Sequence, residues 1–177
     1  MTTEIQLAGF GGQGILFAGK VLAYCGMFAD REVSWLPSYG PEMRGGTCNC
    51  SVTLSDEPIG SPTVYYPDIL MVMNEPSFVK FIGNVKAGGK VFADSTLIDS
   101  KNERSDITVY EVPATRLADE NGLKGGANII LIGKMIAETG IISMNAIEAA
   151  FKKIVPPTKP QLIENNLKAI NLGANYK

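Results

Sequence analysis

A glycine-rich turn near the start of the chain constrains the fold more than any other feature. Its residues are Gly9-Phe10-Gly11-Gly12-Gln13-Gly14. The apolar residues Ile5, Leu7 and Ala8 predict a buried strand before it, and helical spacing of apolar residues over 15–28 predicts a helix after it. Glycine adopts positive φ at low cost and has no Cβ to block a close approach. This order therefore predicts a turn at which the N–H groups of a helix face an oxyanion such as phosphate.

The spacing of Gly9, Gly11 and Gly14 also matches the G-x-G-x-x-G fingerprint of dinucleotide-binding folds. That fingerprint needs an acidic residue at the end of the second strand to bind a ribose. Here Asp30 and Glu32 stand at the start of the second predicted strand instead. Three interpretations remain open: a dinucleotide site, a tight turn that needs glycine for packing, and a phosphate or subunit contact of another kind.

The composition narrows the class of protein. The chain has 177 residues, of which 45% are hydrophobic, and a net charge of −2, which predicts one globular domain over residues 1–177. A chain with this net charge lacks the excess of basic residues that is typical of nucleic-acid-binding proteins. No apolar run reaches the roughly 20 residues that span a membrane. Because a predicted strand begins almost at the N-terminus, we expect no signal peptide and a cytoplasmic protein.

The sequence contains no histidine and three cysteines. Without histidine, a Ser-His-Asp triad and a metal site with histidine ligands are excluded. A [4Fe–4S] cluster with cysteine ligands needs four of them. Cys25 falls in a predicted helix, whereas Cys48 and Cys50 are alternate residues of a predicted strand and point the same way. We therefore expect three free core thiols and no metal site in this chain.

A second turn-rich segment runs from Pro37 to Gly46. It follows a predicted strand at Glu32–Leu36, which forms a βαβ unit with the first strand and helix. The segment holds two prolines, three glycines and the charged residues Glu42 and Arg44. A loop of this length and fixed shape in a compact domain is often functional. The plainer interpretation is a surface loop whose charges are solvated.

The later segments predict a sheet with helices on both faces. Residues 47–55 alternate between apolar and small polar side chains, which predicts an antiparallel or edge strand, and residues 63–66 are expected to return beside it. Buried strands are expected at 69–73, 91–93 and 107–112. Helices are expected from Pro76 to a stop at Gly88-Gly89, at 114–121, at 127–139, at 144–154 and from about 161. The sum is a three-layer α/β/α fold with a mixed, mainly parallel sheet.

The predicted helix at 127–139 is apolar on nearly all sides. It needs more than one covering surface, and we expect a subunit interface to supply the second. Exposed apolar surface of this kind would also allow the isolated chain to form a homodimer, which the sequence leaves open. Ser143 is expected to cap the next helix. Thr158 and Gln161 have capping-box spacing for the last one.

At this point the sequence resembles the gamma subunit of the 2-oxoacid:ferredoxin oxidoreductases, most of all that of the 2-oxoglutarate enzyme (2-oxoglutarate synthase). The resemblance rests on the glycine turn, followed at the right separation by Ser38-Tyr39-Gly40-Pro41-Glu42-Met43-Arg44-Gly45-Gly46. The strand at 47–55, the turn at 59–62, and Val112-Pro113-Ala114-Thr115 ahead of Ala127-Asn128 support it. It covers nearly the whole chain and implies the fold of pyruvate-ferredoxin oxidoreductase catalytic domains. The pyruvate, 2-oxoisovalerate and indolepyruvate enzymes share much of the pattern.

The resemblance implies a role in a complex. Such complexes convert a 2-oxo acid and coenzyme A to acyl-CoA, CO₂ and reduced ferredoxin, using thiamine diphosphate, Mg²⁺ and [4Fe–4S] clusters. This chain lacks a Gly-Asp-Gly stretch of the kind that anchors thiamine diphosphate, and it lacks the cysteines for a cluster. It is therefore expected to bind no cofactor alone and to join subunits that carry thiamine diphosphate and the clusters, with ferredoxin as a further partner.

The candidate site combines the two glycine-rich segments, which we expect to form one surface at the carboxyl ends of adjacent strands. The glycine turn would contact a phosphate of coenzyme A or shape the cleft over thiamine diphosphate. Arg44, oriented by Glu42, would pair with a phosphate or a substrate carboxylate, and Gln13 and Asn49 would add neutral hydrogen bonds. No residue is assigned a catalytic or metal-binding role. The expected cofactor-binding residues are Gly9, Gly11, Gly12, Gln13, Gly14, Tyr39, Glu42, Arg44, Gly45, Gly46 and Asn49.

Three alternatives to this site remain. Both loops could simply dock onto the catalytic subunits, with Arg44 in a structural ion pair. The chain could instead be a stand-alone dinucleotide-binding module or reductase, although it has neither the ribose-binding acid nor a histidine proton donor. It could also be an assembly protein without a ligand.

Overall fold

The computed structural model describes residues 1–38 and 47–177 of the chain. Within them, six strands form one mixed sheet in the order β2-β3-β1-β4-β5-β6. Strands β1, β4, β5 and β6 run parallel, whereas β3 is antiparallel to both of its neighbours. The strands are β1 (Thr2–Phe10), β2 (Glu32–Ser38), β3 (Thr47–Ser55), β4 (Ile69–Val72), β5 (Lys90–Asp94) and β6 (Thr108–Val112).

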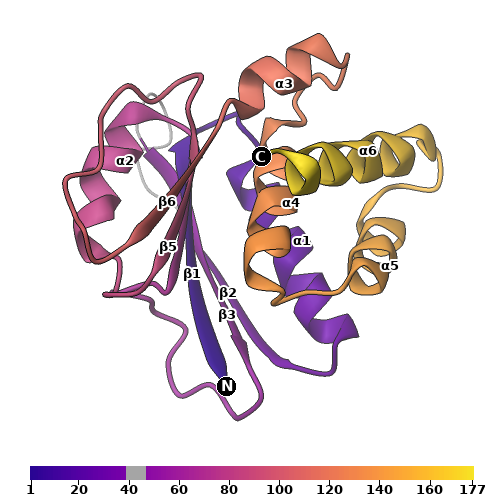
Figure 1. Cartoon of the computed structure of the whole chain (residues 1–177). Coiled ribbons are helices and arrows are strands. Elements are labelled where there is room, and N and C mark those ends of the chain that lie inside the picture. Colours follow the sequence, from indigo (N-terminus) through magenta and orange to yellow (C-terminus); the bar gives the residue numbers. More distant parts are fainter. Residues whose placement is uncertain (39–46) are drawn as a thin grey trace.

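Helices cover both faces of this sheet, as the sequence predicts. Helix α2 lies on one face, while α1, α4, α5 and α6 lie on the other (Figure 1). The helices are α1 (Ile15–Phe28), α2 (Glu75–Phe81), α3 (Ala114–Glu120), α4 (Ala127–Thr139), α5 (Met144–Ile154) and α6 (Gln161–Asn175), with a 3₁₀ turn, η2, at Ile82–Asn84. None of the helices in the described ranges is long and apolar enough to cross a membrane.

The antiparallel strand β3 lies between β1 and β2. Its apolar residues face α1, as the alternating sequence predicts, and belong to the main core. The expected return strand at residues 63–66 is absent, and that prediction was wrong. Both edges of β3 are already paired with β1 and β2, so no edge is free for it. Pro62 and Pro67 also flank the segment and donate no backbone hydrogen bond.

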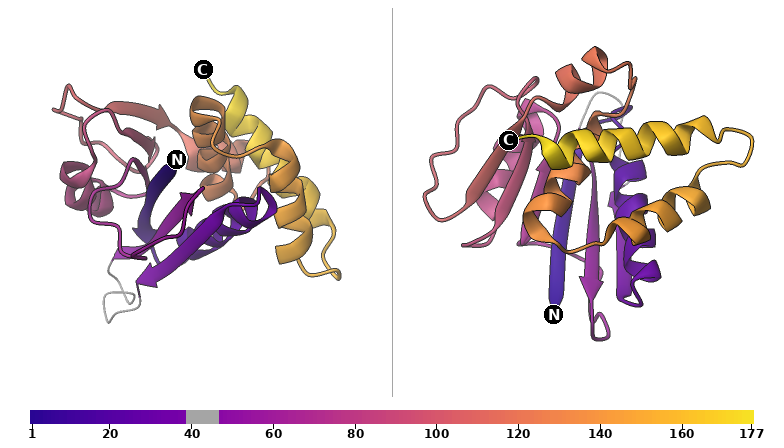
Figure 2. Two further views of the ribbon diagram at one scale, coloured as in Figure 1. Left: turned by 90° about the horizontal axis from the view of Figure 1, so that it is seen from below. Right: turned by 45° about the vertical axis from the view of Figure 1, so that its right-hand side comes forward.

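Helix α4 is covered within the chain itself. All residues from Ala127 to Ile136 are buried, and α6 lies across α4 (Figure 2). The expectation that a subunit interface supplies the second covering surface was therefore wrong. The reason is two glycines: Gly133 faces the backbone of Ile170, and Gly173 faces the backbone of Ile130, which allows the two helices to approach closely.

The helix ends follow the sequence signals in part. The side chains of Asn74 and Ser143 cap α2 and α5, and the Ser143 cap was predicted. Two other predictions were wrong. Helix α2 ends at Phe81 and gives way to the 3₁₀ turn η2, which contains Gly83, well before Gly88. Helix α6 begins after Pro160 without a side-chain cap, so the capping box does not form.

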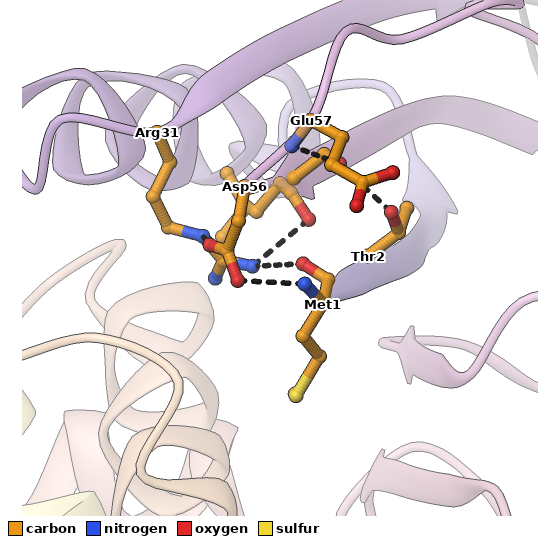
Figure 3. Close-up of polar contacts among 7 residues, drawn as sticks. Met1, Thr2, Arg31, Asp56 and Glu57 are labelled. Atoms are coloured by element: carbon orange, nitrogen blue, oxygen red, sulfur yellow. Dashed lines mark hydrogen bonds and ion pairs between the residues drawn. The ribbon is translucent and has the colours of Figure 1, made fainter.

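The amino-terminal end of β1 is tied to the end of β3. The amino group of Met1 lies 2.7 Å from Asp56 Oδ2, and Arg31 Nε donates to Asp56 Oδ1 at 3.0 Å (Figure 3). Arg31 also donates to the carbonyl oxygens of Met1 and Leu54. These contacts hold the register of the β1–β3 pair at the end that lies away from the glycine turn.

A partly buried ion pair within α4 predicts a pH effect. Lys134 Nζ lies 2.6 Å from Glu138 Oε1 and donates to the carbonyl oxygen of Tyr176. The hydrogen bond from Lys134, and to a smaller extent that from Tyr110, holds the pKa of Glu138 below its ordinary value of 4.5. A carboxyl with a lowered folded pKa stabilises the fold above its unfolded pKa and loses this effect as pH falls through the folded one.

We therefore expect Glu138→Gln to be less stable than the wild type at neutral pH, and the difference to shrink on acidification. Urea unfolding at a series of pH values should give the largest difference above about pH 5, and a vanishing one once the pH has fallen through the folded pKa of Glu138. A difference that stays constant across this range would contradict the ion-pair account.

Candidate functional site

A cavity of about 250 Å³ lies at the carboxyl-terminal edge of the sheet, beside the glycine turn. Helix α1 follows β1 on one face of the sheet, and α2 follows β4 on the other, so the connections diverge between these two neighbouring strands. Open α/β sheets bind ligands at such points. The lining residues are Gly12, Gln13, Met73, Leu97, Thr115, Ala118, Asp119, Gly125 and Ala127.

Different structural requirements explain why glycine occupies each position of the turn. Gly12 and Gly14 have φ values of 95° and 75°, in the left-handed region that favours glycine. A Cβ on Gly9 would lie 2.6 Å from Gln13 Oε1, and one on Gly14 would overlap Asn128 Nδ2. A Cβ on Gly12 would meet nothing within 4 Å. The turn is thus closely packed at both ends and open in its middle.

Two helices begin at this cavity without a cap. Gly14 is the N-cap of α1 and Gly126 that of α4; neither helix has a side-chain cap or an acidic residue in its first turn. The cavity touches both starts, through Gln13 and through Ala127. In α4 the Asn128 side chain already accepts from Ile129 N, and the remaining N–H groups without a side-chain partner, together with the helix dipole, favour negative charge at each of these ends.

Helix α3 differs because a buried carboxylate accepts from an N–H group in its first turn, that of Thr115. Asp94, at the end of β5, is fully buried. It accepts hydrogen bonds from Thr115 N at 3.1 Å, from Thr115 Oγ1 at 2.6 Å and from Thr96 N at 3.1 Å. Thr96 Oγ1 in turn accepts from Arg116 N. Asp94 therefore fixes α3, which forms the wall of the cavity that carries Thr115 and Asp119.

The structure places only some of the predicted site residues at the cavity. Gly12 and Gln13 line the cavity. Asn49 does not: its Oδ1 accepts from Gln6 Nε2 at 3.1 Å, and both side chains lie on the sheet face opposite α1. Tyr39, Glu42, Arg44, Gly45 and Gly46 lie outside the described residues.

The expectation that the two loops follow adjacent strands was wrong. Strands β1 and β2 are parallel, but β3 lies between them. The antiparallel pattern of residues 47–55 was visible in the sequence, whereas their insertion between the strands of the predicted βαβ unit was not.

Several cavity residues were not predicted. Met73 reaches the cavity from just after β4, Thr115 and Asp119 reach it from α3, and Asn128 binds the turn from α4. Thr115 and Asn128 both belong to the motifs that carried the family resemblance. The family resemblance was the signal that could have identified them. Local sequence patterns could not, because these contacts join residues about 60 to 114 positions apart in the sequence.

The three cysteines are packing residues. Each is buried and unpaired. Burial raises the pKa of the thiols of Cys25 and Cys50 to about 12, and it also raises that of Cys48. Thiols of this kind are unreactive at neutral pH. Across residues 1–38 and 47–177, no three potential metal-ligating side chains from His, Cys, Asp or Glu come together.

A second, larger groove of about 350 Å³ lies between α3 and α6. It is lined mainly by apolar and amide side chains and includes no residue of the glycine turn. Its lining is Leu117, Lys168, Asn171, Leu172, Asn175 and Tyr176. The cavity beside the turn is therefore the stronger candidate for a ligand site.

Known proteins are similar to this chain in sequence and in fold. The family described as Pyruvate ferredoxin/flavodoxin oxidoreductase matches residues 4–176, so the chain belongs to that family. It is 39% identical to the 2-oxoglutarate synthase subunit KorC of Methanocaldococcus jannaschii, over 98% of this chain and 92% of that protein. It is also 39% identical to the ketoisovalerate oxidoreductase subunit VorA of Methanothermobacter marburgensis, over 98% of this chain. The chain spans only 36% of VorA.

The crystal structure of the keto/oxoacid ferredoxin oxidoreductase gamma subunit from Geobacter sulfurreducens has the same fold. It matches with a TM-score of 0.85 and 29% sequence identity, over 98% of this chain and 95% of that one. The predicted family resemblance and the predicted α/β fold with a mixed sheet are both confirmed.

Proposed function

We propose that this chain is the gamma subunit of a 2-oxoacid:ferredoxin oxidoreductase. In this proposal it joins subunits that carry thiamine diphosphate, Mg²⁺ and [4Fe–4S] clusters. The complex decarboxylates a 2-oxo acid, transfers the acyl group to coenzyme A and passes the electrons to ferredoxin. Family membership and the near-full-length similarity to KorC support the proposal. The chain itself would supply a binding surface rather than reacting groups.

The observation that carries this role is the cavity at which the glycine turn meets the uncapped starts of α1 and α4. Two helix N-termini that converge without acidic residues favour an anion. We assign this position to a phosphate of coenzyme A. Asp119 lines the wall formed by α3, so the phosphate is placed on the side of Gly12 and Gly125.

The favoured substrate is 2-oxoglutarate. KorC relatives match over nearly their whole length, which supports this choice. The VorA relatives are equally similar over this chain, so 2-oxoisovalerate is the first alternative, followed by pyruvate and indolepyruvate. Initial rates of the reconstituted complex with all four 2-oxo acids would identify the substrate. The proposal expects the highest kcat/KM for 2-oxoglutarate, and a higher value for another acid would reassign the substrate.

A charge series at Leu97 tests the phosphate position. Leu97 lines the cavity and is partly exposed, so polar substitutes are tolerated. Leu97→Glu should raise the KM for coenzyme A about tenfold, the effect of about 1.4 kcal/mol of repulsion, whereas the neutral Leu97→Gln should change it little. Val79→Glu, at an exposed position on α2, is the matched control. Equal KM values for the two Leu97 variants would exclude a phosphate in this cavity.

Arg44 has a separate test. If it pairs with a phosphate or with the substrate carboxylate, Arg44→Ala should raise the KM for coenzyme A or for the 2-oxo acid. Unchanged kinetics would leave Arg44 with a docking role only. Titration of the isolated chain with NAD or FAD, followed by thermal shift, tests the stand-alone dinucleotide module, which a saturable rise in Tm would favour.

A further inference from the structure

We propose that Gln13 and Asn128 are positioning residues that clamp the glycine turn from two sides and do not themselves bind the ligand. This inference deepens the proposed function and rests on it. It also reassigns the glycines of the fingerprint: Gly9 and Gly14 make room for the clamps, and Gly12 is left to face the ligand.

Gln13 uses both ends of its amide on the backbone. Its Oε1 accepts from Phe10 N at 2.6 Å, and its Nε2 donates to the carbonyl oxygen of Met73 at 2.8 Å. The first contact closes the turn on itself, and the second ties the turn to the end of β4. The side chain folds back over Gly9, where a Cβ would lie 2.6 Å from Oε1. Gly9 is therefore needed by the clamp rather than by a ligand.

Asn128 holds the other end of the turn. Its Nδ2 donates to the carbonyl oxygen of Gly14 at 2.9 Å, and its Oδ1 accepts from Ile129 N at 2.9 Å. Asn128 is 2% exposed and stands in the first turn of α4. A Cβ on Gly14 would overlap Nδ2. The contact therefore fixes the start of α1 against the start of α4, the two uncapped ends that meet at the cavity.

The two clamps leave a defined part of the turn accessible. Gly12 lines the cavity, has a φ of 95° and has open space where a Cβ would stand. Because the amide groups of Gln13 and Asn128 are already bonded to backbone atoms, a ligand that used them would break the turn. A ligand therefore meets the backbone around Gly12, whose conformation the clamps hold ready.

Isosteric variants isolate single hydrogen bonds. Asn128→Asp keeps the oxygen that accepts from Ile129 N but turns a carboxylate oxygen toward the Gly14 carbonyl, and Gln13→Glu does the same toward the Met73 carbonyl. Asn102→Asp is the matched control. Asn102 clamps its own turn by donating to the Arg104 carbonyl and accepting from Arg104 N, and it is not among the residues that line the cavity.

The experiment compares these variants in the reconstituted complex. We expect Asn128→Asp and Gln13→Glu each to raise the KM for coenzyme A about tenfold with kcat within about twofold of the wild type. Hydrogen exchange should accelerate at Ala18, whose N–H donates to the Gly14 carbonyl, and stay unchanged in β4. The Asn128→Asp defect should shrink at low pH, where a protonated carboxyl donates to Gly14 again. The Asn102→Asp variant should leave KM unchanged.

Two results would overturn the inference: an unchanged KM in both turn variants although exchange at Ala18 is faster, or the same KM change in the Asn102→Asp control. Failure of the proposed function looks different. In that case the wild-type complex would turn over none of the 2-oxo acids with coenzyme A. Exchange at Ala18 would still test the clamps, and unchanged exchange in both turn variants would overturn them.

Discussion

Replacing Gly173 with alanine is expected to lower the free energy of unfolding by about 3 kcal/mol, although alanine is the better helix former. In an exposed helix this change would stabilise the chain by about 0.5–1 kcal/mol. At Gly173 the new methyl group would overlap the carbonyl oxygen of Ile130 and lie 2.9 Å from the backbone nitrogen of Lys134. Backbone atoms of a helix cannot move aside alone, so α4 and α6 must separate, and overpacking outweighs propensity.

Thermal unfolding measures this effect. A loss of about 3 kcal/mol corresponds to a fall in Tm of about 6–12 °C for a chain of this size. Gly133→Ala, which meets the backbone of Ile170 from the other helix, should behave similarly. Gly60→Ala is the control, because nothing lies within 4 Å of a Cβ there and its φ is ordinary. If Gly173→Ala melted within about 1 °C of Gly60→Ala, the close crossing of α4 and α6 would be refuted.

Removing the carboxylate of Asp94 should have a comparable effect on stability and should also loosen the cavity wall. Asp94→Ala leaves Thr96 N, Thr115 N and Thr115 Oγ1 without their acceptor in a partly buried place. Each unsatisfied buried donor costs about 1–3 kcal/mol, reduced where water enters, so we expect a loss of about 3 kcal/mol. Asp94→Asn keeps one oxygen acceptor and should lose about half as much.

Urea unfolding tests this prediction when Asp94→Ala is compared with a control variant that lacks another carboxylate. Asp99→Ala removes an exposed carboxylate five residues away and should change stability by less than about 0.5 kcal/mol. Helix α3 carries Thr115, Ala118 and Asp119 to the cavity, so Asp94→Ala should also raise the KM for coenzyme A in the complex. Equal stabilities of Asp94→Ala and Asp99→Ala would show that the buried network does not hold α3.

Much of the fold was predictable because local patterns and burial agree. The alternation of residues 47–55, the continuous apolar run of β4 and the helical spacing of α1 each gave the correct element. The bounds of α4 were also correct, but its partner was not. A helix that is apolar on all sides is expected to be buried on all sides, but its sequence does not identify the element that covers it. The structure shows that α6 covers α4, through the close approach at Gly133 and Gly173.

The strand order could not be read from local patterns. The sequence indicates that residues 47–55 form an antiparallel or an edge strand, but not that this strand is internal and lies between β1 and β2. The wrong strand prediction at residues 63–66 has the same cause. A short segment with strand-like residues does not indicate whether a neighbouring strand has an unpaired edge.

The candidate site was predictable in part for the same reason. The glycine turn was found from its residues, and the structure places Gly12 and Gln13 at the cavity. What the sequence could not give is the reason for each glycine. That reason lies in Asn128, which is 114 residues away from Gly14, and in the side chain of Gln13 itself. The roles of Tyr39, Glu42, Arg44, Gly45 and Gly46 stay predictions.

The most direct test of the central claim is native mass spectrometry of the complex recovered from the source cell on a tagged copy of this chain. The account predicts copurification with a subunit that binds thiamine diphosphate and with a subunit that carries iron–sulfur clusters, in a complex that reduces ferredoxin with a 2-oxo acid and coenzyme A. Recovery of this chain alone, or as a homo-oligomer with a bound dinucleotide, would contradict the account and favour a stand-alone nucleotide-binding protein.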